Sequence, residues 1–220
     1  MHFVSQVRNY PAPPMCYREV LRYASCKEED ENTKSLLDSC IAEAQGKIQY
    51  KICYSVLPLE IAEDVCHIAS LEFRSSKLAA NLNGCKEAVV FAASLGIEFD
   101  RLIGKYSRLS PAKALMFQAL GAERIEALCD CLCDEITKEL SCSSRPRFSP
   151  GYGDLDLNAQ KSIFSILDCQ KKIGINLNES LLISPSKSVT AIMGLCEKGE
   201  EVRVNKCSLC SKTDCQFRCL

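Results

Sequence analysis

The sequence has few of the residues on which many enzyme mechanisms depend. It contains two histidines, and it shows no phosphate-binding glycine loop, no nucleophile elbow and no histidine-based triad. Two histidines leave little room for acid–base catalysis led by imidazole. His67, beside Cys66 in an apolar-flanked segment, fits a packed or surface residue better than a metal ligand. The sequence therefore predicts no catalytic residue.

Strong net charge and long apolar runs are lacking as well. A formal net charge of −1 removes the general electrostatic case for binding nucleic acid. No run reaches the roughly 18 apolar residues that a membrane-spanning helix needs. The N-terminal stretch MHFVSQVRNYPAPP also lacks the apolar core of a signal peptide. The sequence thus predicts a cytoplasmic protein with no nucleic-acid or membrane partner.

Cysteine, in contrast, is abundant, with 16 residues in a chain of 220. Without a secretory signal, these cysteines fit reduced thiols, core fillers or metal ligands better than a disulfide framework. Such a composition suits a strongly reducing host. Cys129, Cys131 and Cys133 stand at alternate positions of an expected helix, where side chains point in different directions, and packing roles are expected for them.

Length and periodicity predict one α+β domain at residues 1–203, followed by a cysteine-rich tail at residues 204–220. Helical spacing is found at residues 16–24, 29–45, 77–82, 97–109, 112–140 and from Asp156 or Asn158 to 172. Strands are predicted at 47–57, around 68–73, in EAVVFAASLG and in SVTAIMG, and Pro58 is expected to end the first. Helices interleaved with a few alternating strands indicate mixed helices around a twisted antiparallel sheet.

The segment RPRFSPGYG, residues 145–153, is predicted to be a stiff loop that presents binding groups. Its prolines fix φ, and Gly151 can adopt conformations closed to other residues. Arg145 or Arg147 could bind a carboxylate or phosphate, because a guanidinium offers a fixed fork of donors and keeps its charge. Tyr152 adds a hydroxyl and a ring face. The alternative is a surface loop whose arginines pair with acids on the long helix.

A second candidate is SPSKSVTAIMG, residues 184–194, where a serine-rich, lysine-bearing turn leads into an extended run. Its small hydroxyl residues, Ser188 among them, could touch a ligand. A purely structural strand is the alternative.

An R-x-x-P-G-Y loop, a helix, a NESLLISPS turn and an SVTAIMG strand occur here in that order. Together they resemble the reactivation domain of cobalamin-dependent methionine synthase. The resemblance extends upstream to GCKEAVVFAASLGIEFDRLIGKYSRLSP and the helix IEALCDCLCDEI, so that it covers residues 80–196, whereas residues 1–60 match poorly. It implies a domain that binds S-adenosylmethionine, so that reduction and methylation restore a cobalamin that has oxidised to an inactive form.

The resemblance also implies ligand contacts. Arg147, Gly151 and Tyr152 match the family motif expected at S-adenosylmethionine, and Asp134, ahead of Asp130, stands where the family helix places an acid. A carboxylate there would oppose the ammonium and sulfonium of the ligand, whose transfer from water without an opposing charge is costly.

Met193 falls where the large enzymes carry an aromatic residue at the ligand, and it is assigned with Ser188 to the strand side of the site.

The tail offers a third candidate site, formed by Cys207, Cys210, Cys215 and Cys219. The first pair has the two-residue gap common in zinc and iron–sulfur sites. Four thiolates could close a tetrahedral zinc site or hold a cluster that brings an electron. A redox-active thiol pair and unliganded cysteines are the alternatives.

The resulting hypothesis is an accessory module of a methyltransferase, a stand-alone reactivation subunit supplied in trans. Its partners would be the corrinoid-binding subunit, which carries the cobalamin, and a flavodoxin- or ferredoxin-like reductant. The competing hypothesis is a zinc or iron–sulfur redox or adaptor protein that acts on a corrinoid methyltransferase through the C-terminal cysteines.

Overall fold

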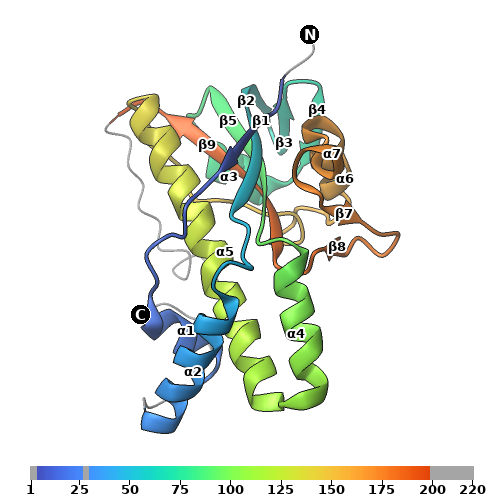
Figure 1. Cartoon of the computed structure of the whole chain (residues 1–220). Coiled ribbons are helices and arrows are strands. Elements are labelled where there is room, and N and C mark those ends of the chain that lie inside the picture. The colour runs from blue at the N-terminus through green and yellow to red at the C-terminus, as the bar shows by residue number, and fades with distance from the viewer. Residues whose placement is uncertain (1–3, 27–29, 199–220) are drawn as a thin grey trace.

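The computed structural model describes residues 4–26 and 30–198, and Figure 1 shows their path. The helices are α1 (Tyr17–Tyr23), α2 (Glu31–Ala44), α3 (Ser76–Leu82), α4 (Ile97–Leu109), α5 (Pro111–Glu139), α6 (Ala159–Leu167) and α7 (Cys169–Ile173). The strands are β1 (Gln6–Asn9), β2 (Lys51–Ala62), β3 (Val65–Ile68), β4 (Leu71–Arg74), β5 (Glu87–Ser94), β6 (Ser143–Ser144), β7 (Asn176–Leu177), β8 (Ile183–Ser184) and β9 (Ser188–Cys196). Most predicted elements are confirmed within a few residues.

One sheet organises the described residues, with strand order β4-β3-β2-β5-β9-β6 and β1 beside β2. Every pairing in it is antiparallel. The two ends of β2 serve different neighbours: Lys51 to Pro58 face β5, and Leu59 to Ala62 face β3. β7 and β8 form a separate small hairpin. The predicted antiparallel α+β class is confirmed.

Helices cover both faces of this sheet, and β5 lies in the middle. Successive side chains of a strand point to opposite faces. Val89 and Phe91 therefore join a core shared with α1, α2, α4 and α5, while Val90 and Ala92 join a second core shared with α3, α6 and α7. Figure 1 shows α5 on one side of the strands and α6 and α7 on the other.

The long helix α5 begins as its local sequence predicts. The Ser110 side chain accepts a hydrogen bond from the Lys113 N–H, and Pro111 occupies the first turn. Gly121 lies within α5, and the helix continues through it without a break. A Cβ at Gly121 would lie 2.5 Å from Cε1 of Phe99 and 2.9 Å from the Lys187 side chain. Glycine is therefore required by the close packing of α4 against α5.

The segment before α1, residues 4–16, is called the arm, and it is fastened to α5 through a buried ion pair. Arg124 is 1% exposed and donates to the carbonyls of Pro13 (2.7 Å) and Pro14 (2.9 Å). Its neighbour Glu123, 4% exposed, pairs with it and accepts from the Cys16 N–H at 2.9 Å. This part of the chain thus consists of β1 followed by an anchored proline segment.

Three predicted boundaries are wrong. Pro58 does not end its strand, because it is the last residue of β2 paired with β5 and the strand then continues beside β3; a proline is tolerated where a strand changes neighbours. Residues 68–73 form a hairpin that turns at Ala69, with φ of 54°. The helix after the loop divides at Asp168, whose φ is 52°.

None of the helices in the described residues combines the length and the apolar composition needed to cross a bilayer.

Candidate functional site

The predicted binding loop lies along β9 and contains a β-bulge. The Arg145 N–H donates to the carbonyl of Gly194 at 2.9 Å. Phe148 and Ile192 exchange two hydrogen bonds of 2.8 Å. The loop thus advances three residues where β9 advances two, which leaves one extra residue in the loop. Phe148 packs on the second core, and Arg147, next to it, is turned toward α5.

Arg147 is held between two carboxylates of α5. Its Nη2 lies 2.8 Å from Glu126, and its Nη1 contacts Asp130. The Arg147 side chain is 12% exposed, whereas those of Glu126 and Asp130 are 46% and 67% exposed. Burial lowers the pKa of Arg147, but the neighbouring thiols and these two carboxylates raise it above its usual value. A charged guanidinium is therefore fixed at the surface of α5 with two accessible acids beside it.

The two acids and the arginine form an unbalanced cluster. Two carboxylates and one guanidinium leave one negative charge in excess. Glu126 and Asp130 are four residues apart on a helix and so share one face. Asp134, the acid preferred from the sequence, is exposed, and among the described residues no ion pair joins it to Arg147. Arg147 therefore pairs with acids of the long helix, as the surface-loop alternative predicts, and of the two aspartates named from the sequence it contacts Asp130.

The rest of the loop is tightly constrained. Gly151 has φ of +86°, and its N–H donates to the carbonyl of the buried Leu155 at 2.9 Å. Gly153 has φ of +60°, and a Cβ there would lie 2.8 Å from Cδ of Lys77. Tyr152, between these glycines, is 70% exposed, and within the described part of the chain no hydrogen bond joins it to Arg147. The rigid loop therefore presents the Tyr152 ring to solvent, without a hydrogen bond to Arg147.

Asp154, which the sequence did not indicate, fastens the end of this loop to α3. Its carboxylate accepts from the Ser76 N–H (2.9 Å), the Ser76 hydroxyl (2.7 Å), the Lys77 N–H (3.3 Å) and the Ser75 hydroxyl. These hydrogen bonds lower the pKa of Asp154 to about 2. An anion is also favoured at the N-terminus of a helix. The contact joins residues 78 positions apart, so no local pattern could have revealed it.

The two residues assigned to the strand side are separated along β9, because Ser188 begins the strand and Met193 lies five residues further on. The Ser188 hydroxyl donates to the Ser94 hydroxyl at 2.8 Å. Met193 is 0% exposed and belongs to the core between the sheet and α5. Five residues of extended strand span about 17 Å. The structure therefore does not bring Ser188 and Met193 together, and Met193 fills a core position.

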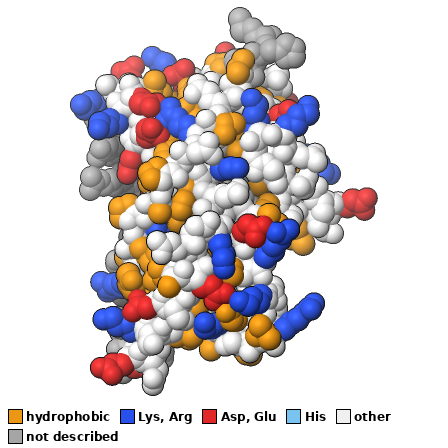
Figure 2. Space-filling model, in the orientation of Figure 1, with side chains coloured by type: hydrophobic (Ala, Val, Ile, Leu, Met, Phe, Trp, Pro, Cys, Tyr) orange, Lys and Arg blue, Asp and Glu red, His pale blue; other side chains and the backbone are white. Residues whose placement is uncertain are grey.

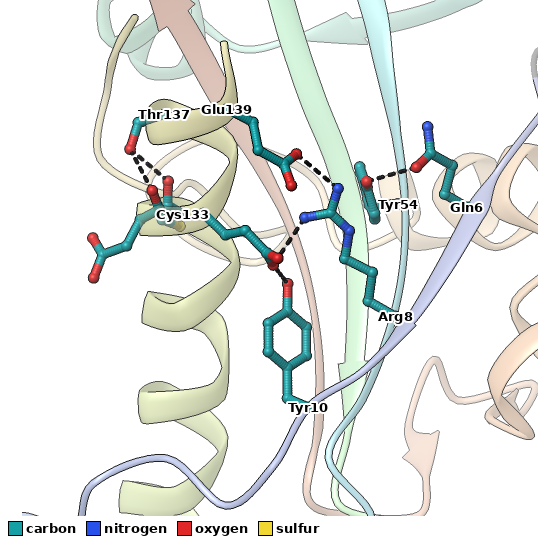
Figure 3. A network of polar contacts seen from close by, with 9 residues as sticks. Gln6, Arg8, Tyr10, Tyr54, Cys133, Thr137 and Glu139 are labelled. Carbon is teal, nitrogen blue, oxygen red and sulfur yellow. Dashed lines mark hydrogen bonds and ion pairs between the residues drawn. The ribbon is translucent and has the colours of Figure 1, made fainter. Parts of the chain in front are cut away.

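A second polar cluster joins β1 and the arm to the C-terminal half of α5. Figure 3 shows Arg8 and Tyr10 reaching toward the helix. Arg8 pairs with Glu135 and Glu139, each at 2.8 Å, and the Tyr10 hydroxyl donates to Glu135. Burial and Glu135 raise the pKa of Tyr10. This cluster fixes β1 against the helix that also carries Glu126.

Charges of both signs are interspersed on the face shown in Figure 2. The described residues contain no group of three or more histidine, cysteine or acidic side chains placed to hold a metal ion. The tail cysteines Cys207, Cys210, Cys215 and Cys219 lie outside the described residues.

Comparisons with known proteins give one family match and one structural likeness. Residues 78–216 match the family described as vitamin B12 dependent methionine synthase, activation domain. A crystal structure of the MetH reactivation domain bound to AdoHcy matches with a TM-score of 0.65 at 14% sequence identity, over 91% of this chain and 81% of that chain. No curated protein sequence matches the chain. At this identity the structural likeness shows the fold.

Proposed function

This chain belongs to the family of vitamin B12-dependent methionine synthase activation domains, and we propose that it binds S-adenosylmethionine and docks on a corrinoid-binding partner. There it would allow reductive methylation of the oxidised cobalamin. Family membership alone does not say which side chains bind the ligand. The loop and α5 supply that part of the proposal.

The observation that carries the proposal is the position of Arg147 between Glu126 and Asp130. The ligand bears a carboxylate, an ammonium and a sulfonium, so it has one positive charge in excess, and the cluster has one negative charge in excess. Arg147 would bind the ligand carboxylate, because a guanidinium matches that group with two parallel hydrogen bonds. A carboxylate of α5 released from Arg147 would then face the ammonium or sulfonium.

The accessibility of the two acids supports this exchange of partners. The side chains of Glu126 and Asp130 are 46% and 67% exposed, so water already reaches them and a ligand can as well. Arg147 itself is largely buried, but it retains one carboxylate as a partner when the other is engaged by a ligand. One of the two contacts can therefore open without leaving the guanidinium unpaired. Gly151 and Tyr152 would border the ligand or the docked partner from the same rigid loop.

When bound, S-adenosylmethionine supplies the methyl group, and bond formation takes place at the partner's corrinoid. The contribution of this chain is positioning and electrostatics. Arg147 holds its charge at a fixed place because the bulge and the Phe148 pairing determine its direction. Asp154 holds the other end of the loop.

A reactivation assay tests this function. The partner is a methionine synthase that carries corrinoid, lacks its own activation domain and has been oxidised to the inactive form. We expect activity to return only when the purified chain, S-adenosylmethionine and a chemical reductant are all added. The Arg147→Ala variant should restore activity at least about tenfold more slowly, because it lacks a charge-assisted contact. The matched control is Arg101→Ala, an exposed arginine paired with Glu98 on α4, which should behave as the wild type. Failure of the wild-type chain to restore activity would contradict the proposal.

The alternative function is a metal-dependent redox or adaptor role of Cys207, Cys210, Cys215 and Cys219. Stoichiometric zinc, or the visible absorption of an iron–sulfur cluster, in the purified protein would support it. In the preferred proposal the electron comes from a separate flavodoxin- or ferredoxin-like protein. Replacement of the four cysteines by serine should then leave reactivation with a chemical reductant intact.

A further inference from the structure

Cys85 and Cys196 form a close thiol pair where β5 and β9 meet. Their Sγ atoms lie 3.6 Å apart, and the Cys85 thiol donates to the sulfur of Cys196. Glu87 of β5 pairs with Leu195 of β9, so the backbones that carry both cysteines are held side by side. A disulfide has an S–S distance of about 2 Å. The two sulfur atoms must therefore approach each other by about 1.6 Å for a bond to form.

The surroundings of this pair are specific. A Cβ at Gly194 would lie 2.6 Å from the Cys85 sulfur, so glycine at that position makes room for the thiol. Arg145 lies beside the same position, with its Cγ 3.4 Å away. Burial and the neighbouring Cys196 raise the pKa of Cys85 to about 12, and the hydrogen bond and charge of Arg145 oppose that rise. A cation next to a thiol stabilises the thiolate through which exchange proceeds.

Both thiols are slightly exposed, Cys85 at 8% and Cys196 at 4%, and a cavity adjoins Cys196. A cavity of about 390 Å³ is lined by Cys196 and Cys142 together with residues of the segments 84–87, 140–142 and 195–198. Cys85 does not line it. A small molecule in the cavity therefore meets Cys196, and the Cys85 sulfur lies 3.6 Å from the Cys196 sulfur.

We propose that Cys85 and Cys196 form a thiol–disulfide exchange site that a low-molecular-weight disulfide reaches through this cavity. Cys196, as the thiolate, attacks one sulfur of the external disulfide, forms a mixed disulfide and releases the first external thiolate. Cys85 then loses its proton, attacks the Cys196 sulfur and releases the second external thiolate. The two protein thiols are oxidised to one disulfide, the external disulfide is reduced to two thiols, and the two protons lost by the cysteines are taken up by the released thiolates.

A second pair provides an internal comparison. The Sγ atoms of Cys53 and Cys169 lie 3.9 Å apart, and both residues are 0% exposed. Neither of them lines the cavity beside Cys196. Separation is thus similar for the two pairs, whereas access differs.

The test is disulfide mapping on the purified full-length chain. Reduced protein is incubated with glutathione disulfide, quenched with acid, alkylated and analysed by peptide mass spectrometry, while circular dichroism follows the fold. We expect a Cys85–Cys196 cross-link to form at least about tenfold faster than a Cys53–Cys169 cross-link, because access of the external disulfide limits exchange. Cys85→Ser should leave Cys196 trapped as a mixed disulfide with glutathione. Arg145→Gln should slow formation of the cross-link.

Cys142→Ser is the matched control, since Cys142 lines the same cavity outside the pair, and its cross-link should form at the wild-type rate. The proposal is overturned if Cys85 and Cys196 both remain free thiols in the folded protein under excess glutathione disulfide. It is equally overturned if Cys196 is joined to any other cysteine in preference to Cys85. The wild-type mapping decides the matter even where a variant does not fold.

Discussion

Arg147 of the loop and Glu126 of α5 lie 2.8 Å apart, joined across 21 residues of sequence. This ion pair holds the one loop arginine that the family motif singles out against α5. It also brings Asp130 into contact with the same guanidinium. The candidate site is therefore an arrangement of loop and helix together.

The first prediction tests which of Asp130 and Asp134 contributes to S-adenosylmethionine binding. Asp130→Asn should weaken S-adenosylmethionine binding by up to about fivefold, because an exposed charge contact contributes up to about 1 kcal/mol. Asp134→Asn, one turn along the helix, serves as the control and should bind as the wild type does. Titration calorimetry measures both dissociation constants. An effect of Asp134→Asn larger than that of Asp130→Asn would restore the acid first chosen from the sequence.

Features that depend on residues close together in the sequence were predictable, whereas features that depend on contacts between distant segments were not. The start of α5 was predictable because Ser110 and Pro111 act within one turn. The alternation in β2 was predictable, but its passage beyond Pro58 depends on β3, which arrives later in the chain. The sequence offered one indication that Glu126 belongs to the site, namely its position four residues before Asp130 on the same helical face.

Other features of the site depend on contacts between distant segments. The bulge that turns Arg147 toward α5 is defined only by hydrogen bonds to Gly194 and Ile192. The anchoring of Asp154 at α3 likewise depends on hydrogen bonds between segments that are distant in the sequence. Met193 matched the position of a ligand residue in the family, yet packing against α5 places it in the core.

The second prediction concerns the buried pair of Arg124 and Glu123. Arg124→Ala removes the cation that pairs with the Glu123 carboxylate and the donor to the carbonyls of Pro13 and Pro14. Breaking a buried ion pair by removal of one partner costs about 3–5 kcal/mol. Urea denaturation should show a loss of this size in the free energy of unfolding. A loss below about 1 kcal/mol, the range of exposed pairs, would show that the arm is not held by this contact.

The third prediction is a pH dependence of stability that Asp154 causes. Its pKa is about 2 in the folded protein and 3.8 ordinarily, so the unfolded chain binds the proton more tightly. The stabilisation is complete above the ordinary pKa and is lost as pH falls toward 2. Asp154→Asn should therefore be less stable than the wild type near neutral pH by about 0.3–1 kcal/mol, the usual effect of a charge at a helix N-terminus. Denaturation curves at several pH values should show the difference shrinking with acidity. A difference that stays constant would assign the effect to something other than the carboxylate charge.

The fourth prediction compares two glycines in neighbouring helices. Gly121→Ala would place a Cβ 2.5 Å from Phe99, so overpacking should cost about 1–3 kcal/mol. Gly104→Ala meets nothing within 4 Å on the exposed side of α4 and should stabilise the protein by up to about 1 kcal/mol. Thermal unfolding of both variants gives the signs directly. Equal effects of the two substitutions would mean that the close approach of α4 to α5 does not depend on Gly121.

Ligand binding at the Arg147 loop is the central claim, and calorimetric titration of S-adenosylmethionine into the purified chain tests it most directly. The titration is made with and without the corrinoid-binding partner, on the wild type and on Arg147→Ala. We predict single-site binding by the wild type that weakens at least about tenfold in Arg147→Ala, the expected loss for a charge-assisted contact. Absence of binding by the wild type in both settings, or equal binding by the two proteins, would contradict the account.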